Sequence, residues 1–233
     1  MRRLVITGLP CPPETWESFL GRRKDQRIIP IYEVFEYSRS ADLREMANYV
    51  AKEIESFAPD SIIAHDLGVP LTLLALMKVN RRSHLRPKVT LFNGAFRKVD
   101  VFRANHPFRL QFMRRRKAVK EVESRGGKVD LRLKKHMSRI RAMYRFIILF
   151  GLTEKLTAAL GLDELIGPPA KFALKVPVQM IVSSNDPYIP FDSIRQLRAD
   201  CSAKRFFELE YGHFPYSISR KKVLPLIEEF ESA

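Results

Sequence analysis

Residues 61–79 combine a short apolar strand, a sharp turn and a helix-length apolar run, and this order constrains the fold more than any other feature of the chain. The strand pattern is Ser61-Ile62-Ile63-Ala64, and the helical pattern begins after Gly68. Between them stands Asp66, with the small residues Ala64 and Gly68 two positions away on either side. A strand that turns directly into a helix is the building unit of a parallel sheet, so we expect an α/β chain.

Strand and helix patterns alternate along most of the remaining sequence. Strands are predicted at residues 4–6, 27–32, 89–92, 178–182 and 205–209, and helices at residues 14–20, 41–57 and 191–200. The helix at 41–57 is amphipathic, because its apolar residues recur at spacings of three or four. The alternation predicts a mostly parallel sheet with helices on both faces. With 233 residues, of which 45% are hydrophobic, the chain can fill one core.

The interval from residue 97 to residue 175 is too long for a loop in a compact domain, and it contains helical patterns of its own. We expect a core formed by residues 1–96 and 176–233, with residues 97–175 inserted as a helical cap. The net charge of +15 is concentrated in this insertion. Seventeen Lys and Arg residues stand against four acids between Arg97 and Arg145. The predicted cap is therefore strongly basic.

The sequence shows no sign of export or of a metal site. No apolar stretch approaches the roughly 18 to 20 residues that cross a bilayer, and Met1-Arg2-Arg3 leads into a strand without a signal-peptide pattern. The two cysteines, Cys11 and Cys201, lack the spacing of a zinc site. No HExxH or comparable metal-ligand spacing is present. We expect a cytoplasmic protein that needs no cofactor and no metal.

Two further polar residues directly follow predicted strands. Asp186 comes after the strand at 178–182, and His213 comes after the strand at 205–209. Ligands bind at the carboxyl edge of parallel sheets, which is where both residues are expected to lie. Each has an ordinary alternative, an Asx turn for Asp186 and a surface histidine for His213. Their order after Asp66 is that of a nucleophile, an acid and a histidine, which favours a catalytic triad.

With these motifs the chain resembles the α/β-hydrolase superfamily over nearly its whole length, and specifically its aspartate-nucleophile branch of epoxide hydrolases and haloalkane dehalogenases. Thr7-Gly8-Leu9-Pro10 stands where the family has His-Gly-x-Pro. Ala64-His65-Asp66-Leu67-Gly68 stands where it has Gly-His-Asp-x-Gly, and residues 97–175 stand where it has a cap. The resemblance implies an α/β-hydrolase fold with Asp66 as nucleophile.

The resemblance also assigns the remaining site residues. It implies a triad of Asp66, His213 and Asp186, and an oxyanion hole formed by the backbone N–H groups of Leu9 and Leu67. Epoxide hydrolases use cap tyrosines as acids, and Tyr144 is the only tyrosine of this cap. Packing within a helix is the alternative role for Tyr144.

Some residues narrow the expected chemistry. Leu67 stands where dehalogenases have a tryptophan, which disfavours dehalogenation, and the one tryptophan, Trp16, is expected in the core or the lid. Thr7 replaces the family's usual histidine. His65 is expected to turn away from the pocket and to form structural hydrogen bonds.

The expected function is a cofactor-free hydrolase, similar to epoxide hydrolases, that acts on a small organic substrate. A carboxylate that attacks a strained or activated carbon forms an alkyl ester, which water then hydrolyses with the help of the histidine. The alternative is a catalytically silent α/β-hydrolase fold that binds an anionic partner through the basic cap. That partner would be a membrane surface, nucleic acid or an acidic protein. Sequence-specific nucleic-acid binding is not expected, since no zinc-finger, RRM or KH pattern occurs. No pattern indicates an oligomeric state.

Overall fold

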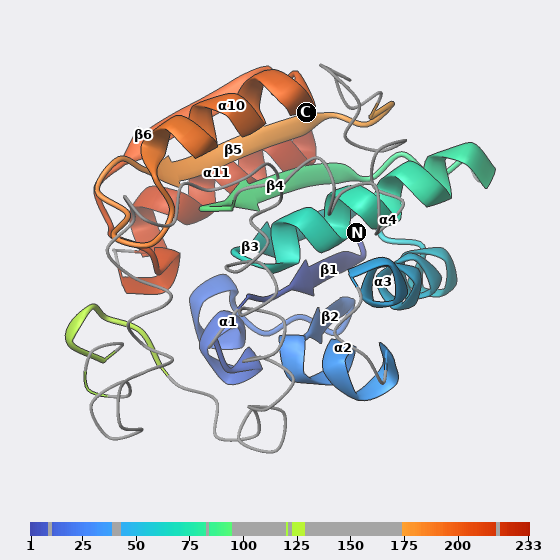
Figure 1. The fold of residues 1–233 in the computed structure, drawn as a ribbon, viewed down its shortest axis with the longest axis horizontal. Coiled ribbons are helices and arrows are strands. Elements are labelled where there is room, and N and C mark those ends of the chain that lie inside the picture. Colours follow the sequence, from blue (N-terminus) through green and yellow to red (C-terminus); the bar gives the residue numbers. More distant parts are fainter. Residues whose placement is uncertain are drawn as a thin grey trace, which may run out of the picture.

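The computed structural model contains a six-stranded parallel sheet (Figure 1). The residues that it describes are 1–8, 11–38, 43–82, 84–94, 120, 123–128, 174–217 and 220–233. The strands are β1 (Arg3–Ile6), β2 (Gln26–Ile29), β3 (Ser61–His65), β4 (Lys88–Phe92), β5 (Val178–Ser183) and β6 (Arg205–Leu209). Their order is β2-β1-β3-β4-β5-β6, and every neighbouring pair is parallel. The carboxyl ends of all six strands therefore meet at one edge, as the sequence predicted.

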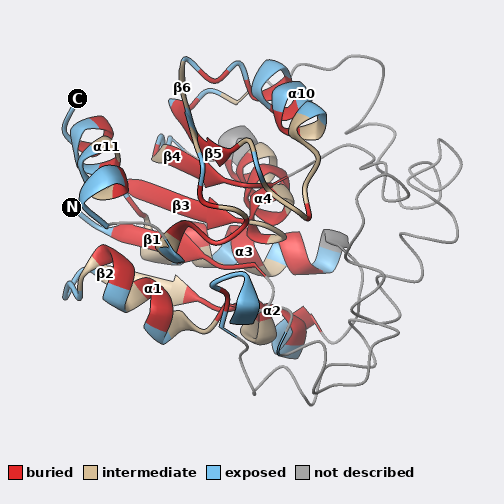
Figure 2. Cartoon of the chain, turned by 90° about the vertical axis from the view of Figure 1, so that its left-hand side faces the viewer, coloured by how far each residue is buried: buried red, intermediate tan, exposed pale blue. Residues whose placement is uncertain are grey.

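Helices cover both faces of this sheet, which confirms the predicted layers. On one face lie α2 (Ile31–Ser38), α3 (Leu43–Phe57), α4 (Gly68–Arg82) and α10 (Phe191–Cys201). On the other face lie α1 (Pro13–Leu20) and α11 (Arg220–Ser232), beside the short 3-10 helix η2 (Pro215–Ser217). Because both faces are covered, β1, β3 and β5 are buried along their length, whereas the edge strands β2 and β6 are only partly buried (Figure 2).

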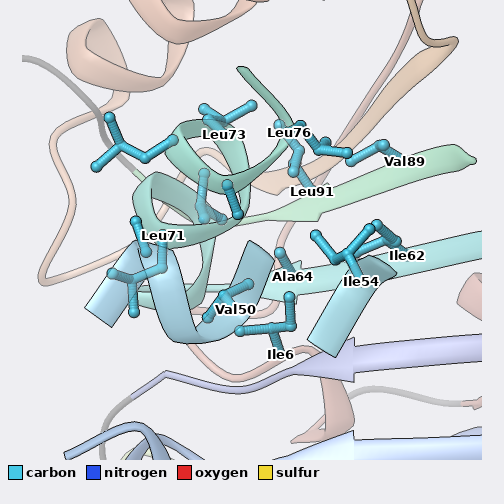
Figure 3. Close-up of a cluster of buried hydrophobic side chains, with 14 of the residues drawn as sticks. Ile6, Val50, Ile54, Ile62, Ala64, Leu71, Leu73, Leu76, Val89 and Leu91 are labelled. Atoms are coloured by element: carbon cyan, nitrogen blue, oxygen red, sulfur yellow. The ribbon is translucent and has the colours of Figure 1, made fainter. Parts of the chain in front are cut away.

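The larger core lies between the sheet and α3 and α4 (Figure 3). Ile62 and Leu91 project from the strands, while Val50 and Ile54 come from the apolar side of α3 and Leu73 from α4. All five side chains are fully buried. Truncating one such leucine or isoleucine to alanine costs about 2–5 kcal/mol. This core holds the β3–α4 connection, and with it Asp66, on a rigid support.

The smaller core lies on the opposite face and is aromatic. Trp16 of α1 is fully buried, and its ring centroid lies 5.9 Å from that of Phe92, at the end of β4. Phe19, Phe214 and Ile227 belong to the same cluster. The prediction of Trp16 as a packed residue is confirmed.

The second strand ends earlier than the sequence pattern predicts. Residues 27–32 were predicted as a strand, but β2 ends at Ile29 and α2 begins at Ile31. Pro30 explains the difference, because proline has no N–H for the sheet ladder and its fixed φ suits a helix start. The Pro30 carbonyl accepts the first helical hydrogen bond, from the N–H of Glu33 at 2.9 Å. The C-terminal helix α11, which contains Pro225, was not predicted at all.

The predicted cap stays a prediction. Residues 97–175 lie outside the described part of the chain, apart from residues 120, 123–128 and 174–175. Within the described residues, no helix is long and apolar enough to span a membrane.

Candidate active site

Asp66 occupies a tight turn between β3 and α4. Its φ of +50° lies in the left-handed region, which residues other than glycine rarely adopt. Among those other residues, aspartate and asparagine tolerate this region best. Its N–H donates to the carbonyl of Phe92 at 3.3 Å, and its carbonyl accepts the N–H of Val69 at 3.0 Å. These bonds fix the turn at the carboxyl edge of the sheet, where the Asp66 side chain is 16% exposed.

The turn needs small neighbours because β1 and the segment after it pack against it closely. A Cβ atom on Gly68 would lie less than 3.0 Å from the carbonyl oxygen of Ile6. A Cβ atom on Gly8 would lie less than 3.0 Å from both the Cβ and the Oδ2 of Asp66. Real Cβ atoms do not approach other atoms so closely. Close packing around Asp66 therefore requires glycine at position 68 and also at position 8.

His213 and Asp186 form an oriented pair. The Nδ1 of His213 lies 2.8 Å from the Oδ2 of Asp186. The other carboxylate oxygen, Oδ1, accepts the N–H groups of Tyr188 at 2.7 Å and Ile189 at 3.0 Å. The Asp186 side chain is fully buried and that of His213 is 3% exposed. The carboxylate is thus held by backbone donors and in turn fixes the orientation of the imidazole.

The second nitrogen of His213 faces Asp66. Its Nε2 lies 3.8 Å from the Oδ1 of Asp66, which is beyond hydrogen-bond distance. The two atoms are close enough for one small molecule, such as water, to contact both. Burial alone would lower the pKa of His213, but the Asp186 carboxylate, its hydrogen bond and the Asp66 charge outweigh burial and raise the pKa. The structure thus brings together the three residues that the sequence singled out.

His65 lies behind the turn and contacts the loop that carries His213. This loop, residues 210–214 between β6 and η2, is called the histidine loop below. Its ring is fully buried, and its Nε2 lies 3.0 Å from the carbonyl oxygen of His213. Burial first, and the neighbouring His213 second, lower the pKa of His65, so the ring is neutral and Nε2 carries the donated proton. The Nδ1 lies 3.7 Å from the Sγ of Cys11. The predicted structural role of His65 agrees with these contacts.

Sequence reasoning missed the polar residue that follows β4. Asn93 is fully buried and contacts the loops that carry His213 and Asp186. Ser183 and Asn185 also bond to the histidine loop. The signal was present, since Asn93 follows a strand just as Asp66, Asp186 and His213 do. A short amide side chain gives no indication of a catalytic or positioning role by itself.

The structure describes only half of the predicted oxyanion hole. Leu67 lies between Asp66 and Gly68, the first residue of α4, so its N–H lies at the N-terminus of that helix. Leu9 and Tyr144 lie outside the described residues. Thr7 is buried, and within the described part of the chain its hydroxyl has no hydrogen-bond partner. No group of three or more potential metal ligands occurs among the described residues.

Comparison with known proteins identifies the fold. No protein-family model matches the chain, and no curated protein matches it by sequence. Solved structures do match, with low identity. Carboxylesterases from the thaumarchaeon Nitrososphaera gargenis align with a TM-score of 0.64 and 15% identity, over 99% of this chain and 90% of theirs.

Two further structures agree. A thioesterase from the prodiginine pathway of Streptomyces coelicolor aligns with a TM-score of 0.61 and 14% identity, over 98% of this chain and 90% of that one. An epoxide hydrolase from Bacillus megaterium aligns with a TM-score of 0.56 and 15% identity, over 99% and 93%. The chain has the α/β-hydrolase fold.

Proposed function

We propose that this chain with the α/β-hydrolase fold is a cofactor-free hydrolase in which Asp66 is the nucleophile. The observation that carries the proposal is the arrangement of Asp66, His213 and Asp186. His213 binds Asp186 through Nδ1 at 2.8 Å and directs Nε2 toward Asp66 at 3.8 Å. This is the order of contacts that a nucleophile, a base and an orienting acid require.

A carboxylate nucleophile selects the class of substrate. If Asp66 attacked an ester, it would form a reactive anhydride, whereas attack on a strained or activated sp³ carbon forms an ordinary alkyl ester. An epoxide supplies such a carbon. The fold that the chain shares with the epoxide hydrolase of Bacillus megaterium is compatible with this substrate class. We therefore expect a small epoxide, opened in two steps.

In the first step, a carboxylate oxygen of Asp66 forms a bond to a ring carbon, and the bond from that carbon to the ring oxygen breaks. The ring oxygen then takes a proton, for which Tyr144 of the predicted cap is our candidate donor. The product of this step is a hydroxyalkyl ester of Asp66. Its formation separates one difficult displacement from the attack of water.

In the second step, the Nε2 of His213 accepts a proton from water, and the water oxygen attacks the Cγ of Asp66. The Leu67 N–H, together with that of Leu9, would stabilise the resulting oxyanion. The bond from Cγ to the ester oxygen breaks, and the proton on His213 passes to the departing oxygen. A diol leaves, the remaining water proton passes from the Asp66 carboxyl to the Tyr144 phenolate, and the regenerated Asp66 carboxylate retains one oxygen from water.

Isotope labelling tests this route directly. A single turnover with excess enzyme in H₂¹⁸O, using a panel of small epoxides, should leave the label in the peptide that contains Asp66 and yield unlabelled diol. A variant with His213→Gln should accumulate the ester, seen as a mass increase on the same peptide. Asp66→Asn should show no adduct.

The outcome that contradicts the proposal is ¹⁸O in the diol after the first turnover, since that would make Asp66 a base for direct attack by water. Equally, an epoxide panel that is never hydrolysed and never labels Asp66 in the His213→Gln variant would remove the basis for an enzymatic role. Asp192, a carboxylate of α10 outside the site, offers the matched control: Asp192→Asn should change neither result.

A second candidate function rests on the charge of the predicted cap. Seventeen Lys and Arg residues between positions 97 and 145 favour an anionic partner, such as an acidic membrane surface. If binding is the function, affinity for vesicles containing phosphatidylserine should fall with added salt and should be unchanged by Asp66→Asn. Salt-independent or absent binding would argue against it.

A further inference from the structure

We propose that Asn93 is a positioning residue that holds the His213 loop against the Asp186 loop and so keeps the Nε2 of His213 directed at Asp66. This inference rests on the proposed function. Asn93 is the first residue after β4, which lies in the sheet between β3, ahead of Asp66, and β5, ahead of Asp186. Its side chain is fully buried between the loops of the site.

The side-chain amide of Asn93 uses both of its donors on the histidine loop. Its Nδ2 donates to the carbonyl oxygens of Gly212 at 2.9 Å and of His213 at 3.1 Å. The His213 carbonyl also lies 3.0 Å from the Nε2 of His65. The carbonyl of the proposed base is therefore held from two directions, by one residue from the end of β3 and one from the end of β4.

The side-chain oxygen of Asn93 joins the histidine loop to the end of β5. The Oδ1 of Asn93 lies 2.8 Å from the backbone nitrogen of Ser183, at the end of β5, and 2.9 Å from the hydroxyl of Tyr211. Ser183 opens the segment that leads to Asp186. One buried amide thus makes four contacts, the full capacity of an asparagine side chain, and links the two loops whose side chains must meet.

The segment of residues 183–186 that leads to Asp186, here called the acid loop, also contacts the histidine loop. The Oγ of Ser183 accepts the N–H of Tyr211 at 3.0 Å, and the Oδ1 of Asn185 accepts the N–H of Gly212 at 2.8 Å. The acid loop therefore binds the amides of the histidine loop, whereas Asn93 binds its carbonyls. The two sets together hold both the N–H and the carbonyl groups of the chain that leads into His213.

Asparagine also suits the backbone at this position. Asn93 has a φ of +32°, on the left-handed side where asparagine is tolerated better than most residues. The preceding residue, Phe92, accepts the N–H of Asp66. Asn93 is therefore next to the anchor of the nucleophile turn, and a change of its conformation would reach all three candidate residues.

Asn93→Gly isolates the role of the side chain. Glycine accepts the positive φ, so the variant removes the four contacts without adding strain, and it alters no charge. Among the described residues, the charged or titratable neighbours of His213 remain, namely Asp186, Asp66, His65 and Tyr188. A change in the pKa of His213 must then come from a change in geometry.

The measurement is the pKa of His213 in the full chain, from NMR titration of its imidazole signals, assigned with His213→Gln. Asp186 is the main group that raises this pKa, so separating the pair in Asn93→Gly should lower it by about one unit. Thr90→Val is the matched control. Thr90 lies on β4, the strand that precedes Asn93, and the variant removes a buried hydrogen bond from the Nε2 of Gln179, at 2.9 Å, away from the site.

The proposal is overturned if folded Asn93→Gly keeps the parent pKa of His213, or if Thr90→Val shows the same fall. Should Asn93→Gly not fold, Tyr211→Phe removes one contact to the Asn93 amide and keeps the ring. It should lower the pKa of His213 by less, and an unchanged value would equally overturn the proposal. The titration needs no substrate, so its outcome is independent of whether Asp66 reacts.

Discussion

The amino and carboxyl edges of the sheet, where the strands begin and end, both bury polar groups, but the charged groups are arranged differently. At the amino edge, Arg3 and Glu231 form a buried ion pair, and the Oγ of Ser61 donates to Glu231 at 2.8 Å. At the carboxyl edge, two carboxylates, Asp66 and Asp186, flank the one imidazole of His213. Opposite charges pair one to one at the amino edge, whereas two carboxylates contact one imidazole at the carboxyl edge.

The difference separates groups that hold the fold from groups that do chemistry. Arg3 and Glu231 neutralise each other, and their ion pair joins β1 to α11. Asp66 instead has a left-handed backbone and keeps its carboxylate partly exposed. Backbone strain of this kind persists at functional sites because the surrounding structure supports it. Substitutions at the two edges should therefore affect different properties.

The largest effect is expected at Asp66. Asp66→Asn should lower kcat by at least about 10⁴-fold, because it removes the nucleophile. Its thermal stability should stay the same or rise, since asparagine tolerates the same φ and one of the two carboxylates is gone. Turnover of an epoxide and the Tm of the same preparation check both parts. Large destabilisation would place Asp66 among the groups that hold the fold.

The reverse pattern is expected at Glu231. Glu231→Ala leaves Arg3 buried without its counter-charge and should lower the free energy of unfolding by about 3–5 kcal/mol. Urea denaturation measures this loss, and the pKa of His213 should not change. Glu228→Ala is the control, because the pair that Glu228 forms with Arg23 is exposed and should contribute little. A comparable loss in both variants would show that burial of the pair does not matter.

A smaller effect on catalysis is expected from Gly8→Ala. The added Cβ would meet the side chain of Asp66 and displace the nucleophile, which should lower kcat by about 10²-fold. Gly21→Ala provides the comparison: Gly21 has a φ of +84° and follows α1, so alanine there adds strain away from the site. It should cost stability and leave kcat unchanged. Equal kcat in the two variants would contradict the close packing at Asp66.

The smallest effect concerns pH. Folding raises the pKa of His213, so protonated His213 stabilises the fold fully below its unfolded pKa of about 6.5. This contribution is lost as pH rises through the higher folded value. The difference in urea midpoint between the parent and His213→Gln should therefore shrink as pH increases across that window. A constant difference would show that the Asp186 contact does not raise the pKa.

The sequence predicted which residues meet at the carboxyl edge better than it predicted the contacts that hold them there. Asp66, Asp186 and His213 each follow an apolar strand, and parallel strands bring such positions together whatever the exact packing. Asn93 meets the same condition, but its role depends on contacts with Gly212 and Ser183 that only the folded chain creates. The end of β2 at Ile29, just before Pro30, was predicted wrongly because the apolar pattern continues into the helix that follows.

The pair of Arg3 and Glu231 has a consequence for the order of folding. The two residues are separated by 228 positions, and β1 lies inside the sheet between β2 and β3. Contacts of such long sequence separation form slowly, because a large loop must close first. We expect α11 to dock late, and until it does, the guanidinium of Arg3 must remain in water. The first strand of the chain can therefore complete its burial only when the last helix arrives.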